Sequence, residues 1–165
     1  MFMLKCAVYF AATGLLSFFL GRLIPPNKME WHRFPYKLYR IEKEGQIYKK
    51  IGIHHWQNKV PDMSKVFPKL MPPKKMVATD KDSLIRMIQE TCTAELTHIV
   101  LCLTGLYCIK LWPGAGGIVL TMLNTLGNMI FILIQRYNRP RLVRLYKRQI
   151  EKEMQLIHGD PDIDL

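Results

Sequence analysis

The chain has 165 residues, 49% of them hydrophobic, and a formal net charge of +11. This length suffices for one domain, and such apolar content with such charge excludes an ordinary small soluble fold in favour of a membrane protein with its charges on one side. The basic residues flank apolar runs, so anionic lipid headgroups explain them without a nucleic-acid partner. We therefore expect a single membrane domain over residues 1–165.

The first apolar run covers about residues 4–24, which is long enough to cross the hydrocarbon core. It has almost no basic residues before it, and its charges follow it. This pattern favours an uncleaved anchor over a secretory signal peptide. Pro25 and Pro26 are expected to end this span.

Apolar side chains then recur at alternating spacings of three and four from Trp31 to Tyr48. The pattern predicts an amphipathic helix from near Pro35 to about Ile51. Its polar face is basic, which is typical of a helix lying in the membrane interface, although packing against the rest of the protein would give the same pattern. Residues 52–65 show no period and are expected to form a loop with a turn at Pro61.

A further helix, capped by Thr79 or Asp80, is expected to continue into a second span at about residues 96–112. The third span covers about residues 117–134, and the short connection makes the two a transmembrane hairpin. The predicted fold is therefore an all-α integral membrane protein. It has three transmembrane helices, one N-terminal span plus a C-terminal hairpin, with an interfacial amphipathic helix.

Charge predicts the orientation of this fold. The segment 25–95 and the tail 135–165 are rich in lysine and arginine, whereas the hairpin connection has almost no charge. The positive-inside rule then places the N-terminus outside the cell membrane, and the segment and tail in the cytoplasm. The acidic end, residues 160–164, is expected to be a disordered tail.

The chain has four cysteines, Cys6, Cys92, Cys102 and Cys108, which follow no metal-binding or disulfide spacing. Three of them fall in or beside apolar helices, so they are predicted to be small packing residues.

Polar side chains gather where the second and third spans reach the cytoplasmic side. Glu95 and His98 are three residues apart and share a helix face. An ionisable pair at the start of a membrane helix is a functional candidate, although a wet carboxylate beside a packing histidine is an equal alternative. Asn124 fits helix–helix packing, whereas Asn128 is predicted to face His98 across the hairpin.

These residues suit acyl transfer to a hydroxyl. His98 would be the base, Glu95 would orient it, and Asp62 is the alternative base. Asn128 and Arg139 would stabilise the oxyanion or hold the donor. The substrate-binding candidates are Trp56, Lys59, Lys65, Asn124, Gln135, Arg136, Asn138, Arg139 and Arg141.

The arginines after the third span bind phosphates well through bidentate forks. Pro140 is expected to turn the chain there and aim them, although simple positive-inside anchoring explains such a basic flank too. No cofactor is expected, and an acyl donor such as acyl-coenzyme A would be a co-substrate.

Several familiar catalytic patterns are missing from the sequence. It has no glycine-rich phosphate loop, no Gly-x-Ser-x-Gly elbow, no paired-cysteine metal site and no histidine followed four residues later by aspartate. A metal held by Glu95, His98 and either His54 or His55 is a minor alternative, and no metal is expected.

Five segments resemble the small bacterial glycosyl-diaponeurosporenoate acyltransferases. They are Phe19–Pro25, Glu42–Lys49, Trp56–Lys65, Ala94–His98 and Gln135–Leu142, of which Trp56–Lys65 and Gln135–Leu142 are the most specific. The resemblance implies an integral membrane enzyme that esterifies a sugar hydroxyl of a membrane-embedded glycolipid with a fatty acyl group. It does not fix the acceptor or assign catalytic residues.

Two other classes of function stay open at this stage. A non-catalytic adaptor would bind partner helices and anionic lipid; it would tolerate loss of Glu95, His98 or Asp62 but not of Gly105 or Gly127. A reductase or phosphate-group transferase acting on lipid is the weaker alternative. Membrane lipids and a lipid-linked acceptor are the expected partners, and the oligomeric state is open.

Overall fold

A computed structural model describes residues 1–60 and 80–158, and all the regular structure in these two ranges is helical. Three helices are long and apolar enough to cross a membrane: Phe2–Leu23, Lys81–Leu111 and Ala115–Ile157. The predicted class, an all-α protein with three membrane-spanning helices, is confirmed. The first is helix α1 (Phe2–Leu23), the second combines α5 (Lys81–Gly105) and the short α6 (Cys108–Leu111), and the third is α7 (Ala115–His158).

Helix α5 begins where the sequence predicts. The Asp80 side chain caps it by accepting a hydrogen bond of 3.0 Å from the backbone N–H of Ser83, which satisfies one of the first free amides of the helix. The helix then runs without interruption into the apolar part of the chain and ends at Gly105.

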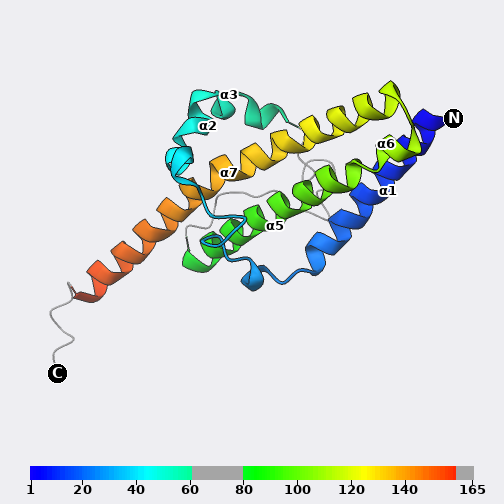
Figure 1. Ribbon diagram of the computed structural model, residues 1–165. Coiled ribbons are helices and arrows are strands. Elements are labelled where there is room, and N and C mark those ends of the chain that lie inside the picture. Colours follow the sequence, from blue (N-terminus) through cyan, green and yellow to red (C-terminus); the bar gives the residue numbers. More distant parts are fainter. Residues whose placement is uncertain (61–79, 159–165) are drawn as a thin grey trace.

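Helices α5 and α7 lie side by side and antiparallel as the predicted hairpin, with α1 along the other side of α5 (Figure 1). The tight connection at residues 112–114 includes Gly114 with a φ of +100°, a conformation that favours glycine. The hairpin therefore places residues near the start of α5 opposite residues near and beyond the middle of α7.

Pro140 does not turn the chain, so the predicted turn is wrong, and helix α7 continues beyond the predicted span end at Ile134. The helix continues through Pro140 to His158 and extends well past the other helices (Figure 1). A proline removes one helical hydrogen bond, but here its ring is buried and faces Gly45, where a Cβ atom would lie 2.9 Å from Pro140 Cγ. Tertiary packing therefore favours the continuous helix.

We call residues 29–60 the collar, because they wrap the hairpin beside the end of α1 (Figure 1). The predicted single amphipathic helix is not present there. The collar instead contains η2 (Arg40–Gly45), α2 (Gln46–Lys50), α3 (Ile53–Trp56) and η3 (Gln57–Lys59), after the short η1 (Pro26–Lys28). Gly45 (φ +90°) and Gly52 (φ +71°) break the helix by adopting left-handed backbone.

The expected loop at residues 52–65 is also partly helical, since it includes α3 and η3. The predicted turn at Pro61, together with Asp62, Lys65 and Thr79, lies outside the described residues. So does the acidic tail at residues 160–164.

The inner face of the collar packs on the hairpin at several places, two of which involve buried tyrosines. Tyr36 and Met29 pack around Cys92 of α5. Tyr48 and Ile53 pack on Tyr137 of α7. The alternating apolar pattern in the sequence therefore does mark a buried face, although short elements rather than one helix present it.

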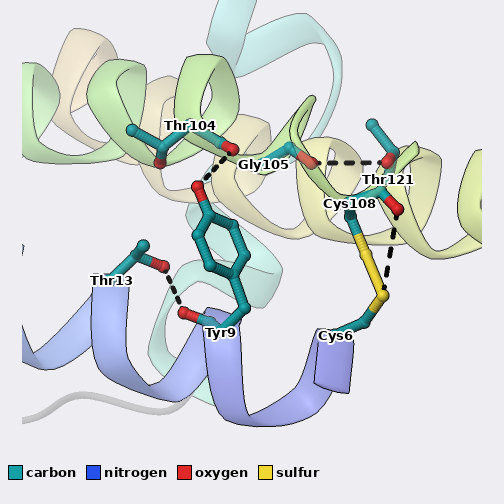
Figure 2. The surroundings of a disulfide bond; sticks show 7 residues. All are labelled: Cys6, Tyr9, Thr13, Thr104, Gly105, Cys108 and Thr121. Carbon is teal, nitrogen blue, oxygen red and sulfur yellow. Dashed lines mark hydrogen bonds between the residues drawn. A yellow bond between two sulfur atoms is a disulfide. The ribbon is translucent and has the colours of Figure 1, made fainter. Parts of the chain in front are cut away.

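Cys6 of α1 and Cys108 of α6 form a disulfide with a Cα–Cα distance of 5.8 Å (Figure 2), so the prediction of packing cysteines without a disulfide is wrong for this pair. The two residues are 102 positions apart in the chain, and such a pairing cannot be read from spacing. Nearby, the Tyr9 hydroxyl donates to the Thr104 carbonyl over 2.9 Å. These contacts fix the start of α1 to the hairpin, whereas Cys92 and Cys102 are free thiols.

Candidate active site

Four charged side chains form a charge cluster where the collar meets the hairpin. They are Glu42 of the collar, Glu95 of α5, and Arg136 and Arg139 of α7. The two oxygens of Glu95 are divided between the arginines, since Oε1 accepts from Arg136 Nε over 2.8 Å and Oε2 accepts from Arg139. Two positive and two negative charges therefore balance in one buried site.

Arg139 is the more enclosed of the two arginines in the charge cluster, with 1% of its surface exposed. Its Nε donates to Thr91 Oγ1 over 2.9 Å, and one terminal nitrogen donates to the Tyr36 carbonyl over 2.7 Å. The other terminal nitrogen donates to the Thr91 carbonyl and to Glu95. With every nitrogen donating inside the protein, the predicted contact of Arg139 with an acyl donor does not fit this geometry.

Arg136 is similarly engaged. Its terminal nitrogens donate to Glu42 Oε1 over 2.6 Å and to the Pro35 carbonyl over 2.7 Å. Arg136 therefore joins the collar to both hairpin helices, and a phosphate would have to displace these bonds to bind it.

Glu42 is the member that sequence reasoning missed. Its carboxylate accepts from the Tyr48 hydroxyl and from the Tyr39 backbone N–H. Burial opposes ionisation, but hydrogen bonds from Tyr48, a backbone amide and Arg136 outweigh it and lower the pKa of the Glu42 carboxyl. Burial and the bond to Glu42 in turn raise the pKa of the Tyr48 hydroxyl. The segment Glu42–Lys49 is one of those that resemble the acyltransferase family, but its sequence does not indicate that Glu42 pairs with a residue of α7.

The prediction that Glu95 pairs with His98 and orients it is wrong. The two residues are one turn apart on α5, but the Glu95 carboxylate contacts Arg136 and Arg139, and His98 contacts α7 at another place. A fully buried carboxylate is stabilised best by permanently charged, hydrogen-bonding guanidinium groups. Glu95 therefore pairs with the two arginines of α7 rather than with His98. The spacing of residues within α5 does not reveal this pairing.

His98 belongs instead to a chain of hydrogen bonds that we call the amide relay: His98, Asn128 and Asn124. His98 Nδ1 lies 2.8 Å from Asn128 Oδ1. Asn128 Nδ2 donates to the carbonyl and the Oδ1 of Asn124, over 2.9 and 3.2 Å. Asn124 Nδ2 donates back to the Leu101 carbonyl of α5 over 3.1 Å. The prediction that Asn128 faces His98 across the hairpin is confirmed.

The relay fixes the state of the imidazole. A backbone carbonyl only accepts hydrogen bonds, so the amide nitrogen of Asn128 must point toward Asn124 and its oxygen toward His98. His98 Nδ1 therefore carries the proton, which leaves the lone pair on Nε2. Within residues 1–60 and 80–158, Nε2 has no hydrogen-bond partner.

Packing holds the ring and the relay in place. The Phe131 ring stacks on His98 with centroids 4.6 Å apart and planes 6° apart. Gly105 makes room for Asn124, because a Cβ atom at position 105 would lie 2.3 Å from Asn124 Nδ2. The half-buried His98 is thus packed on one face and hydrogen-bonded through one of its two ring nitrogens.

The other predicted residues are spread around this site. Trp56 packs beside Leu133 and Ile134 and donates to the Ile51 carbonyl over 3.4 Å. Lys59 and Arg141 are exposed, and Arg141 lies over the Tyr137 ring. Gln135 and Asn138 are half-buried.

The rings of His54 and His55 are in contact in α3, with centroids 3.8 Å apart and planes tilted by 43°. Burial, followed by the nearby His55 and Lys49 charges, lowers the pKa of His54. Among the residues that the structure describes, no three His, Cys, Asp or Glu side chains gather in a way that would hold a metal ion.

The fold and the site define a small helical protein with three helices long and apolar enough to span a membrane, and with a histidine of the hairpin held by hydrogen bonding through one ring nitrogen. The model of the glycosyl-4,4'-diaponeurosporenoate acyltransferase family matches residues 32–148, and the chain belongs to that family. The match includes both the charge cluster and the amide relay.

The relatives of this chain include proteins of that name from Staphylococcus aureus. The one from strain MRSA252 is 28% identical over 151 residues, covering 89% of this chain and 91% of its own length. Those from strains bovine RF122 / ET3-1 and USA300 are 27% identical with the same coverage. No solved structure gives a significant match. The chain is an acyltransferase, and the adaptor, reductase and phosphate-transferase alternatives are set aside.

Proposed function

We propose that this enzyme transfers a fatty acyl group to a sugar hydroxyl of a membrane-embedded glycolipid or glycosylated isoprenoid. The relatives are named for an acceptor of the second kind, a glycosylated carotenoid acid. The single observation that carries the proposal is His98, whose Nδ1 is hydrogen-bonded to Asn128 and whose Nε2 is free of partners in the described residues.

In this mechanism Nε2 of His98 removes the proton of the acceptor hydroxyl as its oxygen attacks the acyl carbonyl. The tetrahedral intermediate then collapses, the donor thiolate leaves, and it takes the proton from the imidazolium. Every proton and electron pair is accounted for with an acyl thioester such as acyl-coenzyme A as donor. Asn128 acts as a positioning residue that holds the tautomer.

In this proposal the charge cluster has a structural role, whereas its arginines by themselves would suggest binding of the donor phosphates. Because Arg136 and Arg139 are engaged inside the protein, they hold the collar over the hairpin rather than the donor phosphates. The exposed cations Lys59 and Arg141 are the better candidates for those phosphates, which they would contact at the surface.

The test compares the wild type with His98→Ala in a host that lacks the protein but is supplied with a glycosylated carotenoid. Mass spectrometry of the extracted lipids should show a species heavier by one acyl group with the wild type. His98→Ala should lower its rate of formation by about 10²–10⁴-fold, at equal membrane levels. Full activity of His98→Ala would refute the base, and no product from the wild type would refute the acceptor class.

We also propose that the N-terminus lies outside the cell membrane and the charge cluster at the cytoplasmic face. The distribution of lysine and arginine supports this orientation. The Cys6–Cys108 disulfide supports it independently, because it lies at the N-terminal end of α1 and disulfides persist on the oxidising side of a membrane.

Thiol labelling of intact cells tests this orientation. A membrane-impermeant maleimide should label Cys6 and Cys108 only after treatment with an impermeant reductant. A cysteine introduced in place of Leu156, which is exposed near the end of α7, should resist labelling until the cells are opened. Labelling of that position in intact cells would overturn the orientation.

A further inference from the structure

The collar has an outward face as well as the inward face that packs on the hairpin. Four large apolar side chains are exposed there: Phe34 (82%), Ile41 (75%), Ile51 (56%) and Ile47 (41%). A group of exposed apolar side chains of this size marks an interaction surface. The broken backbone of the collar produces this face, since its short elements direct some apolar residues inward and others outward.

Cations are interspersed with these apolar residues. Lys37, Arg40, Lys49 and Lys50 are all exposed. None of the four pairs with a carboxylate within the described parts of the chain. This face therefore differs from the charge cluster behind it, where each arginine has a protein carboxylate.

The position of the collar along the hairpin, given by the residues of α7 that it contacts, suggests what covers its outward face. Trp56 packs beside Leu133 and Ile134, the last apolar residues before α7 becomes basic. Glu42 contacts Arg136, two positions further along. The collar thus lies at the boundary between the apolar and the basic parts of the hairpin, where a bilayer surface would be found.

We propose that the outward face of the collar docks on anionic phospholipid headgroups of the adjoining leaflet. Phe34, Ile41, Ile47 and Ile51 enter the boundary between headgroups and acyl chains. The four cations lie at the level of the lipid phosphates. Apolar side chains mixed with unpaired lysine and arginine are the composition that binds an anionic bilayer surface. This docking is independent of the acyl-transfer chemistry.

The test uses the full-length protein in lipid nanodiscs, with Cys92 and Cys102 replaced by alanine and the disulfide retained. A fluorescent thiol probe is attached to Phe34→Cys or Ile41→Cys. Nitroxide groups placed just below the lipid headgroups, and aqueous iodide, serve as the two quenchers. Met122→Cys, exposed within α7, is the membrane control and Leu156→Cys the aqueous control.

We expect the probes at positions 34 and 41 to be quenched by the lipid nitroxide and protected from iodide. Phosphatidylglycerol should increase this quenching over phosphatidylcholine alone. In the variant with Lys37, Arg40, Lys49 and Lys50 changed to glutamine, the increase should be lost. Quenching by iodide alone, as at position 156, would overturn the docking, and quenching that ignores phosphatidylglycerol would overturn its anionic specificity.

Discussion

The charge cluster and the amide relay both use α5 and α7, and the charge cluster adds Glu42 of the collar. The two groups differ in which hydrogen-bonding atoms they leave without a partner. In the charge cluster, all three nitrogens of Arg136 and of Arg139 donate to protein acceptors. In the amide relay, every polar atom on the path has a partner except Nε2 of His98, within the described residues. A cluster whose hydrogen-bond donors are all used inside the protein fits a structural role. A ring held in place with one nitrogen unpartnered fits a catalytic role.

The comparison also shows how a membrane protein uses buried polar groups in two ways. A buried charge that loses its partner is strongly destabilising, so the charge cluster couples the collar to the hairpin. Neutral amides have a smaller desolvation cost, so the relay can lie further along the span. The variants below separate the two roles.

Arg139→Ala should have the largest effect on stability. It leaves Glu95 with one cation and removes the bonds to Thr91, so we expect a loss of about 3–5 kcal/mol. Thermal unfolding of the purified protein measures it. Arg141→Ala, which removes an exposed arginine two residues away, is the matched control and should change stability little. An equal effect of the two variants would contradict the architectural role.

Asn128→Leu should lower kcat by about 10²-fold, because the imidazole loses its fixed tautomer and orientation, while KM changes little. Asn128→Asp distinguishes positioning from oxyanion stabilisation. Its carboxyl oxygen still accepts from His98 Nδ1, so it should restore much of the rate if Asn128 positions the base. If Asn128 donated to the oxyanion, Asn128→Asp would be as inactive as Asn128→Leu.

Gly105→Ala should disturb the packing of the amide relay without changing any of its hydrogen-bonding groups. The added methyl group would displace the Asn124 amide, and such overpacking costs about 1–3 kcal/mol. Gly127→Ala is the control, because a Cβ there has no atom within 4 Å. Thermal unfolding and the acylation rate together measure the effect, and equal behaviour of the two glycine variants would argue against the tight packing.

Of the four predicted effects, the smallest is a loss of stability of the collar at acidic pH. The folded-state pKa of Glu42 is lowered, so its stabilisation is present above the ordinary glutamate pKa of about 4.3. It is lost as the pH falls through the folded-state value. The protection factors of the η2 and α2 amides in hydrogen exchange, which correct for the intrinsic exchange rate at each pH, should fall below about pH 4, and Glu42→Gln should remove much of that pH dependence.

Much of the relay could be foreseen. His98 and Asn128 face each other because both follow from helical periodicity plus an antiparallel hairpin, and both rules act over short stretches of chain. The tautomer could not be foreseen, since it depends on the direction of the Asn128 amide. That direction is set by the position of the Asn124 carbonyl in space.

The charge cluster was foreseen in its residues but not in its pairing. Glu95, Arg136 and Arg139 were all singled out, yet the sequence suggested that Glu95 would orient His98 and that the arginines would bind a ligand. Glu42 supplied the missing partner from 94 residues away. Long-range ion pairs leave no local pattern, so charged residues near a membrane boundary look alike whether they face water or each other.

By itself the sequence determined the three spans, the Asp80 cap and the hairpin, because hydropathy and capping are properties of neighbouring residues. Only the tertiary structure decided that Pro140 stays within a helix, that Gly45 and Gly52 break the collar, and that Cys6 meets Cys108. Each of these outcomes depends on what lies opposite the residue in space. That neighbour belongs to a distant part of the chain, which only the folded arrangement of the helices brings near.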